Sequence, residues 1–156
     1  MRKIAATLTT LALAGLGLII PATTAQAAPG CDDNYHATPS GYMYAFDGNY
    51  CEVYLGRSNT QDTDWGNGAG GFQGGDTNKA SSLVYKGSSG TAMKVYNGTG
   101  DDFGGGYNCI SAGEYYVDVL AGNKFTATTG NPIDVNNQIS SHKKVSESAC
   151  NGHFME

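Results

Sequence analysis

Short runs of alternating apolar and polar residues, separated by turn signals, fill most of the chain after residue 40. The clearest are Tyr42, Tyr44 and Phe46; Met93 and Val95; Tyr115, Val117 and Val119; and the apolar run 83–85. A period of two residues is typical of half-buried strands, and this region shows almost no helical period. The pattern therefore predicts an all-β sandwich or barrel.

Two halves of this region carry the same landmarks in the same order. An aromatic residue followed by Asp-Gly or Asn-Gly stands at 46–48 and again at 96–98, and these dipeptides favour tight hairpins. A cysteine and then a serine-rich hexapeptide follow in each half. The second half is longer around Thr99 to Gly106, where three glycines would let the chain fold closely over its neighbour. We interpret the halves as a duplication.

The hexapeptide of the second half is Asn136-Asn137-Gln138-Ile139-Ser140-Ser141, and a weaker copy runs from Thr77 to Ser82. Several side-chain oxygens on one tight turn suit a hard cation such as calcium, which takes six to eight oxygen ligands. The alternative is purely structural, because asparagine and serine side chains also brace turns by bonding nearby backbone amides. The residues alone leave both interpretations open.

The first 27 residues are interpreted as an export signal. Arg2 and Lys3 precede an uncharged apolar run from Ile4 to Ile20, and Ala25-Gln26-Ala27 is a small-x-small cleavage site. A membrane anchor is the alternative, but the run is slightly short for a span. We therefore expect a secreted, extracellular protein with no membrane association, consisting of a signal peptide, 1–27, and a single domain, 28–156.

The charge of this domain bears on its partners. The chain holds nine basic and fourteen acidic residues. The signal contains two of the basic ones and no acidic one, so the domain carries 7 − 14, or −7. Such a surface repels phosphate backbones, and no nucleic-acid partner is expected.

Four cysteines, Cys31, Cys51, Cys109 and Cys150, lie after the signal, and an even number in an exported chain indicates two disulfides. No pair has the short gap of a zinc site. Three pairings are possible. We favour Cys31–Cys51 and Cys109–Cys150, which keep each bridge within one half.

With these landmarks, the chain resembles the βγ-crystallin superfamily, and within it the secreted bacterial proteins of peptidase inhibitor family I36. The second half carries the resemblance in Val95-Tyr96, Phe103-Gly104-Gly105, Cys109, Gly113 and the hexapeptide 136–141. The first half matches at Tyr44, Phe46 and Gly48, but Thr77 replaces the expected Asn or Asp. The resemblance implies a disulfide-stabilised sandwich of two Greek-key motifs, at about 41–86 and 92–145.

The resemblance also implies calcium ligands. By position they are Asn136, Asn137 and Ser140 in the second motif, and Asn78 and Ser81 in the first. In the family each motif contributes to both sites, and backbone carbonyls from the hairpin loops complete them. Because this chain has Asn where Asp would add charge, and Thr77 in the first copy, we expect one moderate site and one weak or absent site.

The sequence gives little support for an enzyme. Its three histidines, His36, His142 and His153, have no spacing that ties them to a serine and an aspartate, and no Gly-x-Ser-x-Gly occurs. We expect no catalytic activity.

The family instead implies an inhibitor of an extracellular metallopeptidase, which would act through the loops 62–75 or 99–106. Trp65, in the first of these loops, is interpreted as an exposed partner contact, although it could also fold back over the core. Two further hypotheses remain, a calcium-stabilised extracellular structural or interaction module and a killer-toxin-like antimicrobial protein. The sequence does not specify an oligomeric state.

Overall fold

The computed structural model describes residues 30–101, 103–127 and 130–156, so the predicted signal peptide lies outside the described residues. Within these ranges the α-helix and the strands are α1 (Cys31–Ala37), β1 (Met43–Asp47), β2 (Val53–Ser58), β3 (Ala80–Tyr85), β4 (Thr91–Tyr96), β5 (Tyr107–Ser111), β6 (Tyr116–Val117) and β7 (Ser141–Ser146). Short 3-10 turns occupy Asn49–Cys51, Gly74–Asp76 and Glu147–Cys150. No helix within these ranges is long and apolar enough to cross a membrane.

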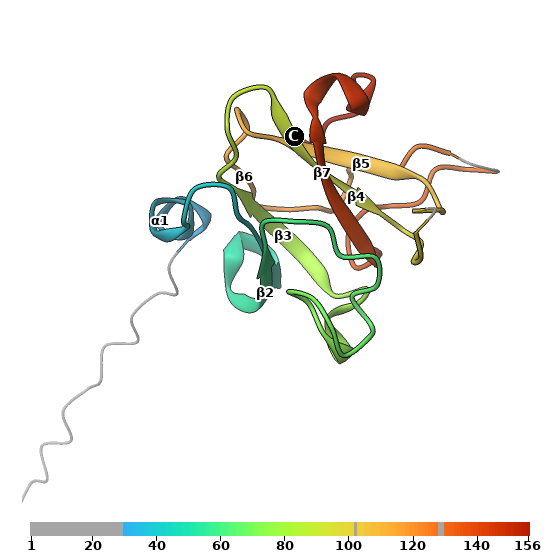
Figure 1. Cartoon of the computed structure of the whole chain (residues 1–156), viewed down its shortest axis with the longest axis horizontal. Helices are drawn as coiled ribbons and strands as arrows, with labels where there is room; N and C mark the ends of the chain where they lie inside the picture. Colours follow the sequence, from blue (N-terminus) through green and yellow to red (C-terminus); the bar gives the residue numbers. More distant parts are fainter. Residues whose placement is uncertain (1–29, 102, 128–129) are drawn as a thin grey trace, which may run out of the picture.

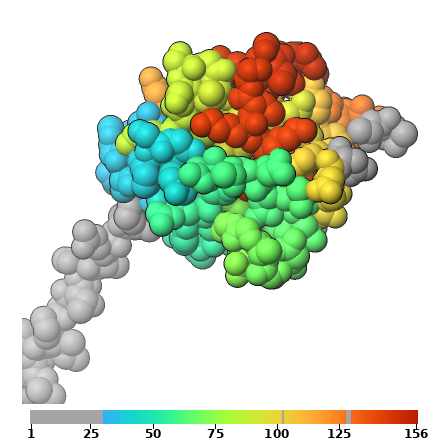
Figure 2. All heavy atoms as spheres, viewed as in Figure 1, coloured from blue at the N-terminus to red at the C-terminus, as the bar shows by residue number. Residues whose placement is uncertain are grey.

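The strands form two antiparallel sheets that pack face to face (Figure 1). One sheet has the order β2-β1-β3-β6 and the other has the order β5-β4-β7. Strand β6 belongs to the second half of the chain by sequence but pairs with β3 of the first half. In turn, a residue of the first half pairs with the second sheet: Asp62 forms an isolated antiparallel bridge with His142 on β7. Figure 2 shows the green segment that follows β2 lying directly against the red C-terminal segment.

Backbone hydrogen bonds show how closely the halves correspond. Where β6 joins the first sheet, Leu120 N donates to Ser81 O, and Tyr50 N donates to Asp118 O. At the equivalent place in the other half, Trp65 N donates to Ser140 O and Gly100 N donates to Thr63 O. These bonds make Leu120 equivalent to Trp65, Asp118 to Thr63 and Tyr50 to Gly100. The exchange of one strand between motifs, with two sheets, confirms the predicted sandwich of two Greek-key motifs.

Alternation along the strands separates two cores. Met43 and Ala45 on β1, like Met93 and Val95 on β4, point between the sheets into the main core. Phe46 instead faces outward, into a smaller cluster with the Cys31–Cys51 disulfide and, at its edge, Tyr44. The alternation thus predicted the β1 strand correctly, but the aromatic side chains pack on the outer face of the sheet. Of 115–119, only β6 is a strand, and Tyr115 is exposed.

Helix α1 precedes the repeated region and packs on the first sheet at β3 and β6. The alternation did not predict it. Asp32 and Asp33 in its first turn suit the positive end of the helix dipole. Its first residue is bridged to Cys51, and the second disulfide joins Cys109 to Cys150. Both predicted pairings are confirmed.

The Asp-Gly and Asn-Gly dipeptides do not form the tight hairpins that the sequence predicted. The link between β1 and β2 includes a 3-10 turn, and the link between β4 and β5 is the longer loop expected at 99–106. A Cβ atom on Gly105, which has φ +84°, would lie 2.7 Å from Gly98 N. This confirms that the glycines permit a close crossing of two backbone segments.

Candidate functional site

The two hexapeptides form matching turns that lead into β3 and β7. Asn78 and Asn137 stand at the same position of each turn, with φ of 57° and 56°, a left-handed conformation that asparagine tolerates better than most residues. Each turn bonds to the opposite motif, because Asn78 N donates to Ile139 O (2.9 Å) and Asn137 N donates to Ala80 O (2.8 Å). The turns therefore meet at the contact between the halves.

Their side chains cross over in the same way. The hydroxyl of Ser81 donates to Asn137 Oδ1 and the hydroxyl of Ser140 donates to Asn78 Oδ1, both at 2.9 Å. Four of the five predicted metal ligands thus lie in two crossed serine–asparagine pairs. Ser81 and Ser140 are buried, whereas the two asparagines are exposed. In this arrangement each serine hydroxyl is hydrogen-bonded to an asparagine oxygen of the other motif.

The last serine of each hexapeptide has a separate role that sequence reasoning missed. The Ser82 hydroxyl donates to Gly48 O at 2.8 Å and accepts from Cys51 N at 2.9 Å. In the second half, the Ser141 hydroxyl donates to Gly98 O. These bonds attach the hairpin loops to β3 and β7. The repeat of Ser-Ser at corresponding places was the signal that could have identified them.

The fifth predicted ligand, Asn136, supplies an observation that bears on calcium. Its Oδ1 atom is buried and accepts no hydrogen bond within the described part of the chain. A buried acceptor without a partner lowers the stability of the fold by about 1–3 kcal/mol, and a bound cation would remove this penalty. Within the described residues no three His, Cys, Asp or Glu side chains are grouped to hold a metal ion. The predicted ligands of the hexapeptides are neutral amide and hydroxyl oxygens. These residues fit a weak calcium site at the second hexapeptide.

The first hexapeptide fits a cation less well. Thr77 stands where Asn136 stands in the second, and Lys79 adds a positive charge to the same turn. Gln138, the equivalent of Lys79 in the second hexapeptide, carries no charge. The fit therefore favours the second hexapeptide.

Trp65 is not an exposed partner contact, and that prediction is wrong. The indole is fully buried and stacks on Phe72, with ring centroids 3.9 Å apart and planes within 11°. Its Nε1 donates to His142 Nδ1 at 2.7 Å, so its polar group has a partner inside the core. Leu120 occupies the equivalent position in the other half, which explains why a large apolar side chain belongs there.

His142 is also fully buried. Because Nδ1 accepts from Trp65, the proton of the neutral ring sits on Nε2, which is buried and makes no good hydrogen bond with the described residues. Burial lowers the pKa of His142 from 6.5 to about 3, while the Thr60 backbone acts in the opposite direction. The imidazole is therefore neutral at physiological pH and part of the core.

The loop 62–75 is held by its own side chains. Asp62 Oδ1 accepts from Asp64 N at 3.1 Å, Asp64 Oδ1 from Gly66 N at 2.8 Å, and Asn67 Oδ1 from Ala69 N at 2.7 Å. The buried Trp65 and Phe72 anchor both ends of the exposed glycine-rich stretch between them. The loop is a series of turns braced by its own side chains.

Searches of protein-family models and of curated proteins find no match for the chain. Among solved structures, it is similar to a chain described under the evolution of the eye-lens βγ-crystallin domain fold, with 18% identity, 70% of this chain and 90% of that chain covered, and a TM-score of 0.48. A βγ-crystallin from Ciona intestinalis has 20% identity, coverages of 67% and 100%, and a TM-score of 0.45. A βγ-crystallin domain from Flavobacterium johnsoniae has 19% identity, coverages of 69% and 97%, and a TM-score of 0.42.

These likenesses concern the fold alone. The exchange of β6 and the Asp62 bridge, which the chain shows by itself, agree with the predicted fold class. The fold is a sandwich of two Greek-key motifs with two disulfides. Disulfides are typical of proteins in oxidising compartments outside the cytosol.

Proposed function

We propose that this protein is a secreted, non-catalytic interaction module that is stabilised by calcium at the second hexapeptide. The observation that carries the proposal is the unsatisfied Oδ1 of Asn136, beside crossed serine–asparagine pairs that join the two halves. A cation held there would link both motifs and so oppose their separation.

In this proposal Asn136 and Asn137 supply amide oxygens, and Ser81 supplies a hydroxyl from the other motif. None of these three ligands carries a negative charge to offset the charge of calcium, so the calcium affinity is modest. Because the hydrogen-bonded pairs already satisfy Ser81 and Ser140, the protein folds without the ion. Calcium raises stability rather than creating the fold.

The test is thermal unfolding of the oxidised protein, residues 28–156, in EDTA and in increasing calcium. At a hundredfold excess over the dissociation constant a ligand adds about 2.7 kcal/mol, which is a rise in Tm of roughly 10 °C for a domain of this size. Asn136→Ala should remove most of this rise. Thr77→Ala, at the equivalent position of the first hexapeptide, is the matched control and should retain it. An unchanged Tm in 10 mM calcium would refute the calcium site.

Metallopeptidase inhibition is the second candidate function, and the braced loop 62–75 favours it. An inhibitor gains affinity when its contact loop is rigid before binding. Titrating the oxidised protein against a thermolysin-like zinc endopeptidase tests this directly. Stoichiometric loss of peptidase activity, weakened by Asn67→Ala, supports the hypothesis. Full peptidase activity at a large molar excess of the protein rules it out for that class of enzyme.

A further inference from the structure

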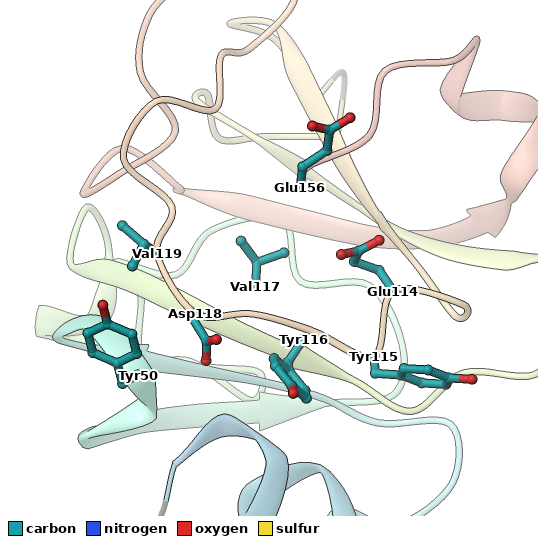
Figure 3. Close-up of a pocket in the computed structure, with 8 residues that line it drawn as sticks. All are labelled: Tyr50, Glu114, Tyr115, Tyr116, Val117, Asp118, Val119 and Glu156. Atoms are coloured by element: carbon teal, nitrogen blue, oxygen red, sulfur yellow. The ribbon is translucent and has the colours of Figure 1, made fainter.

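A cleft of about 560 Å³ on the described chain combines tyrosine rings with carboxylates. Besides two valines, its walls are Tyr50, Tyr115, Tyr116, Glu114, Asp118 and Glu156. Figure 3 shows that these side chains come from β6 and its flanks, from the turn before β2 and from residue 156. Three acidic residues and no basic residue line it. We call it the acidic cleft.

A neighbouring cleft of about 440 Å³ has the same character. Tyr115 lines both clefts, and Tyr35 and Glu147 belong to the second, which again contains no basic residue. The rings of Tyr115 and Tyr35 meet edge to face, with centroids 5.0 Å apart. Lys86 lies 5.0 Å from the Tyr35 ring, but its ammonium donates to the carbonyls of Tyr35 and His36 and is not part of the cleft wall.

The other half of the fold provides an internal comparison. A smaller cleft of about 260 Å³ lies at Thr63 and Asp101, and Thr63 is the equivalent of Asp118. This cleft has no aromatic residue in its wall. Gly100 takes the place of Tyr50, with φ of 98° against 57° for the tyrosine. The Greek-key scaffold therefore forms a cleft here without tyrosines.

Two of the three tyrosines of the acidic cleft also adopt an unfavourable backbone conformation. Tyr50 and Tyr115 both have positive φ, 57° and 69°, which costs a non-glycine residue stability. These two residues are 58% and 50% exposed, so burial does not compensate fully for this cost. A ring held at the surface in a strained position is available for contact with another molecule.

We propose that the two clefts form one docking surface for an extended basic segment of a partner protein, with one lysine or arginine side chain in each cleft. Charge complementarity selects this occupant, because four carboxylates and no cation line the clefts. Tyrosine rings cover the aliphatic stem of a lysine or arginine and attract its charged head. The chain contains an example of this contact, since Lys94 Nζ lies 3.3 Å from the Tyr107 ring centroid.

Tyr115, shared by both clefts, explains why a segment with two charges fits better than a single amine. One ring separates the two acidic sites, so side chains that project from one extended backbone can occupy both. The inference rests on the proposed role as an interaction module, but it does not depend on calcium binding.

The experiment measures fluorescence anisotropy of labelled peptides with two lysines placed one to four residues apart in Gly and Ser. Glutamine versions of the peptides and N-acetyl-lysine amide serve as probe controls. We expect saturable binding of at least one two-lysine peptide, weakened by salt between about 50 and 300 mM. Glu114→Gln with Asp118→Asn should weaken binding about five- to tenfold. The matched pair Glu52→Gln with Asp101→Asn removes the same charge elsewhere and should leave binding unchanged.

A second variant separates the surface from the scaffold. Tyr115→Gly removes the shared ring and relieves the strained φ, so binding should fall at least fivefold while thermal stability is kept or raised. Equal loss in both charge pairs, absence of binding at 1 mM peptide, or equal affinity for the single amine would each overturn the inference. The calcium-dependent rise in Tm is measured in the same variants, so failure of peptide binding is distinguished from failure of the calcium site.

Discussion

His142 makes the stability of this protein depend on pH in a specific way. The ring is fully buried, and its Nδ1 accepts the Trp65 indole hydrogen at 2.7 Å. Protonation would place a second donor against that indole N–H inside the core. Accordingly, burial lowers the pKa of His142 from 6.5 to about 3 in the folded protein.

The sign of the effect follows from which state, folded or unfolded, binds the proton at the higher pH. As pH falls below 6.5, the unfolded chain takes up a proton that the folded protein refuses until about pH 3. The stabilising contribution is therefore complete above pH 6.5 and declines toward pH 3. The loss is about 2 kcal/mol at pH 5 and about 4 kcal/mol at pH 3, since one pKa unit corresponds to about 1.36 kcal/mol.

Urea unfolding between pH 7 and pH 4, followed by fluorescence, measures this loss. Trp65 is the one tryptophan of the chain and lies against His142, so it reports on the right region. His142→Asn keeps an acceptor for the indole but does not titrate. Its overall stability is lower because the smaller side chain leaves a cavity, so the quantity compared is the change with pH.

The wild-type protein should lose about 2 kcal/mol more than His142→Asn between pH 7 and pH 5. His153→Asn, which replaces an exposed histidine, should show the wild-type dependence. The reasoning is refuted if the wild-type protein and His142→Asn lose the same free energy of unfolding over this range.

Two further predictions concern the scaffold. In urea unfolding, Gly56→Ala should destabilise the protein by about 2 kcal/mol or more, because the new Cβ would lie 2.4 Å from Gly71 O and 2.7 Å from the Phe72 ring. The control Gly68→Ala places a Cβ that meets nothing within 4 Å, and its stability should stay within about 0.5 kcal/mol of wild type. Ser82→Ala should cost about 1–3 kcal/mol by the same assay, because Gly48 O and Cys51 N both lose a buried partner; a cost no greater than that of the exposed Ser89→Ala would contradict this.

The repeat made much of the fold predictable. Strand alternation is a local signal, and the order of aromatic-Gly, cysteine and Ser-Ser landmarks gave the two motifs and both disulfide pairings. The landmarks are readable because each has a local backbone function, such as the left-handed turn at Asn78 and Asn137. Helix α1 lies before the repeat, and its position depends on the disulfide to Cys51.

The burial of Trp65 was harder to predict because its partners are distant. The surrounding Gly, Asp and Asn residues read as an exposed loop, while the acceptor of the indole hydrogen is 77 residues away. A closer use of the repeat would have helped. The residue after Ser81-Ser82 is the buried Leu83, so the residue after Ser140-Ser141, which is His142, was a candidate for the core.

The same comparison of halves separates what the scaffold needs from what it does not. Ser82 and Ser141 recur and attach a loop to a strand in each half, so folding accounts for them. Tyr50 has no counterpart in the other half. Gly100 stands at the equivalent position and forms the equivalent backbone hydrogen bond without a side chain. A residue that strains the backbone where glycine suffices is not required by the fold. The exposed ring of Tyr50 lies in a cleft with three carboxylates, and this surface is therefore where we expect a partner to bind.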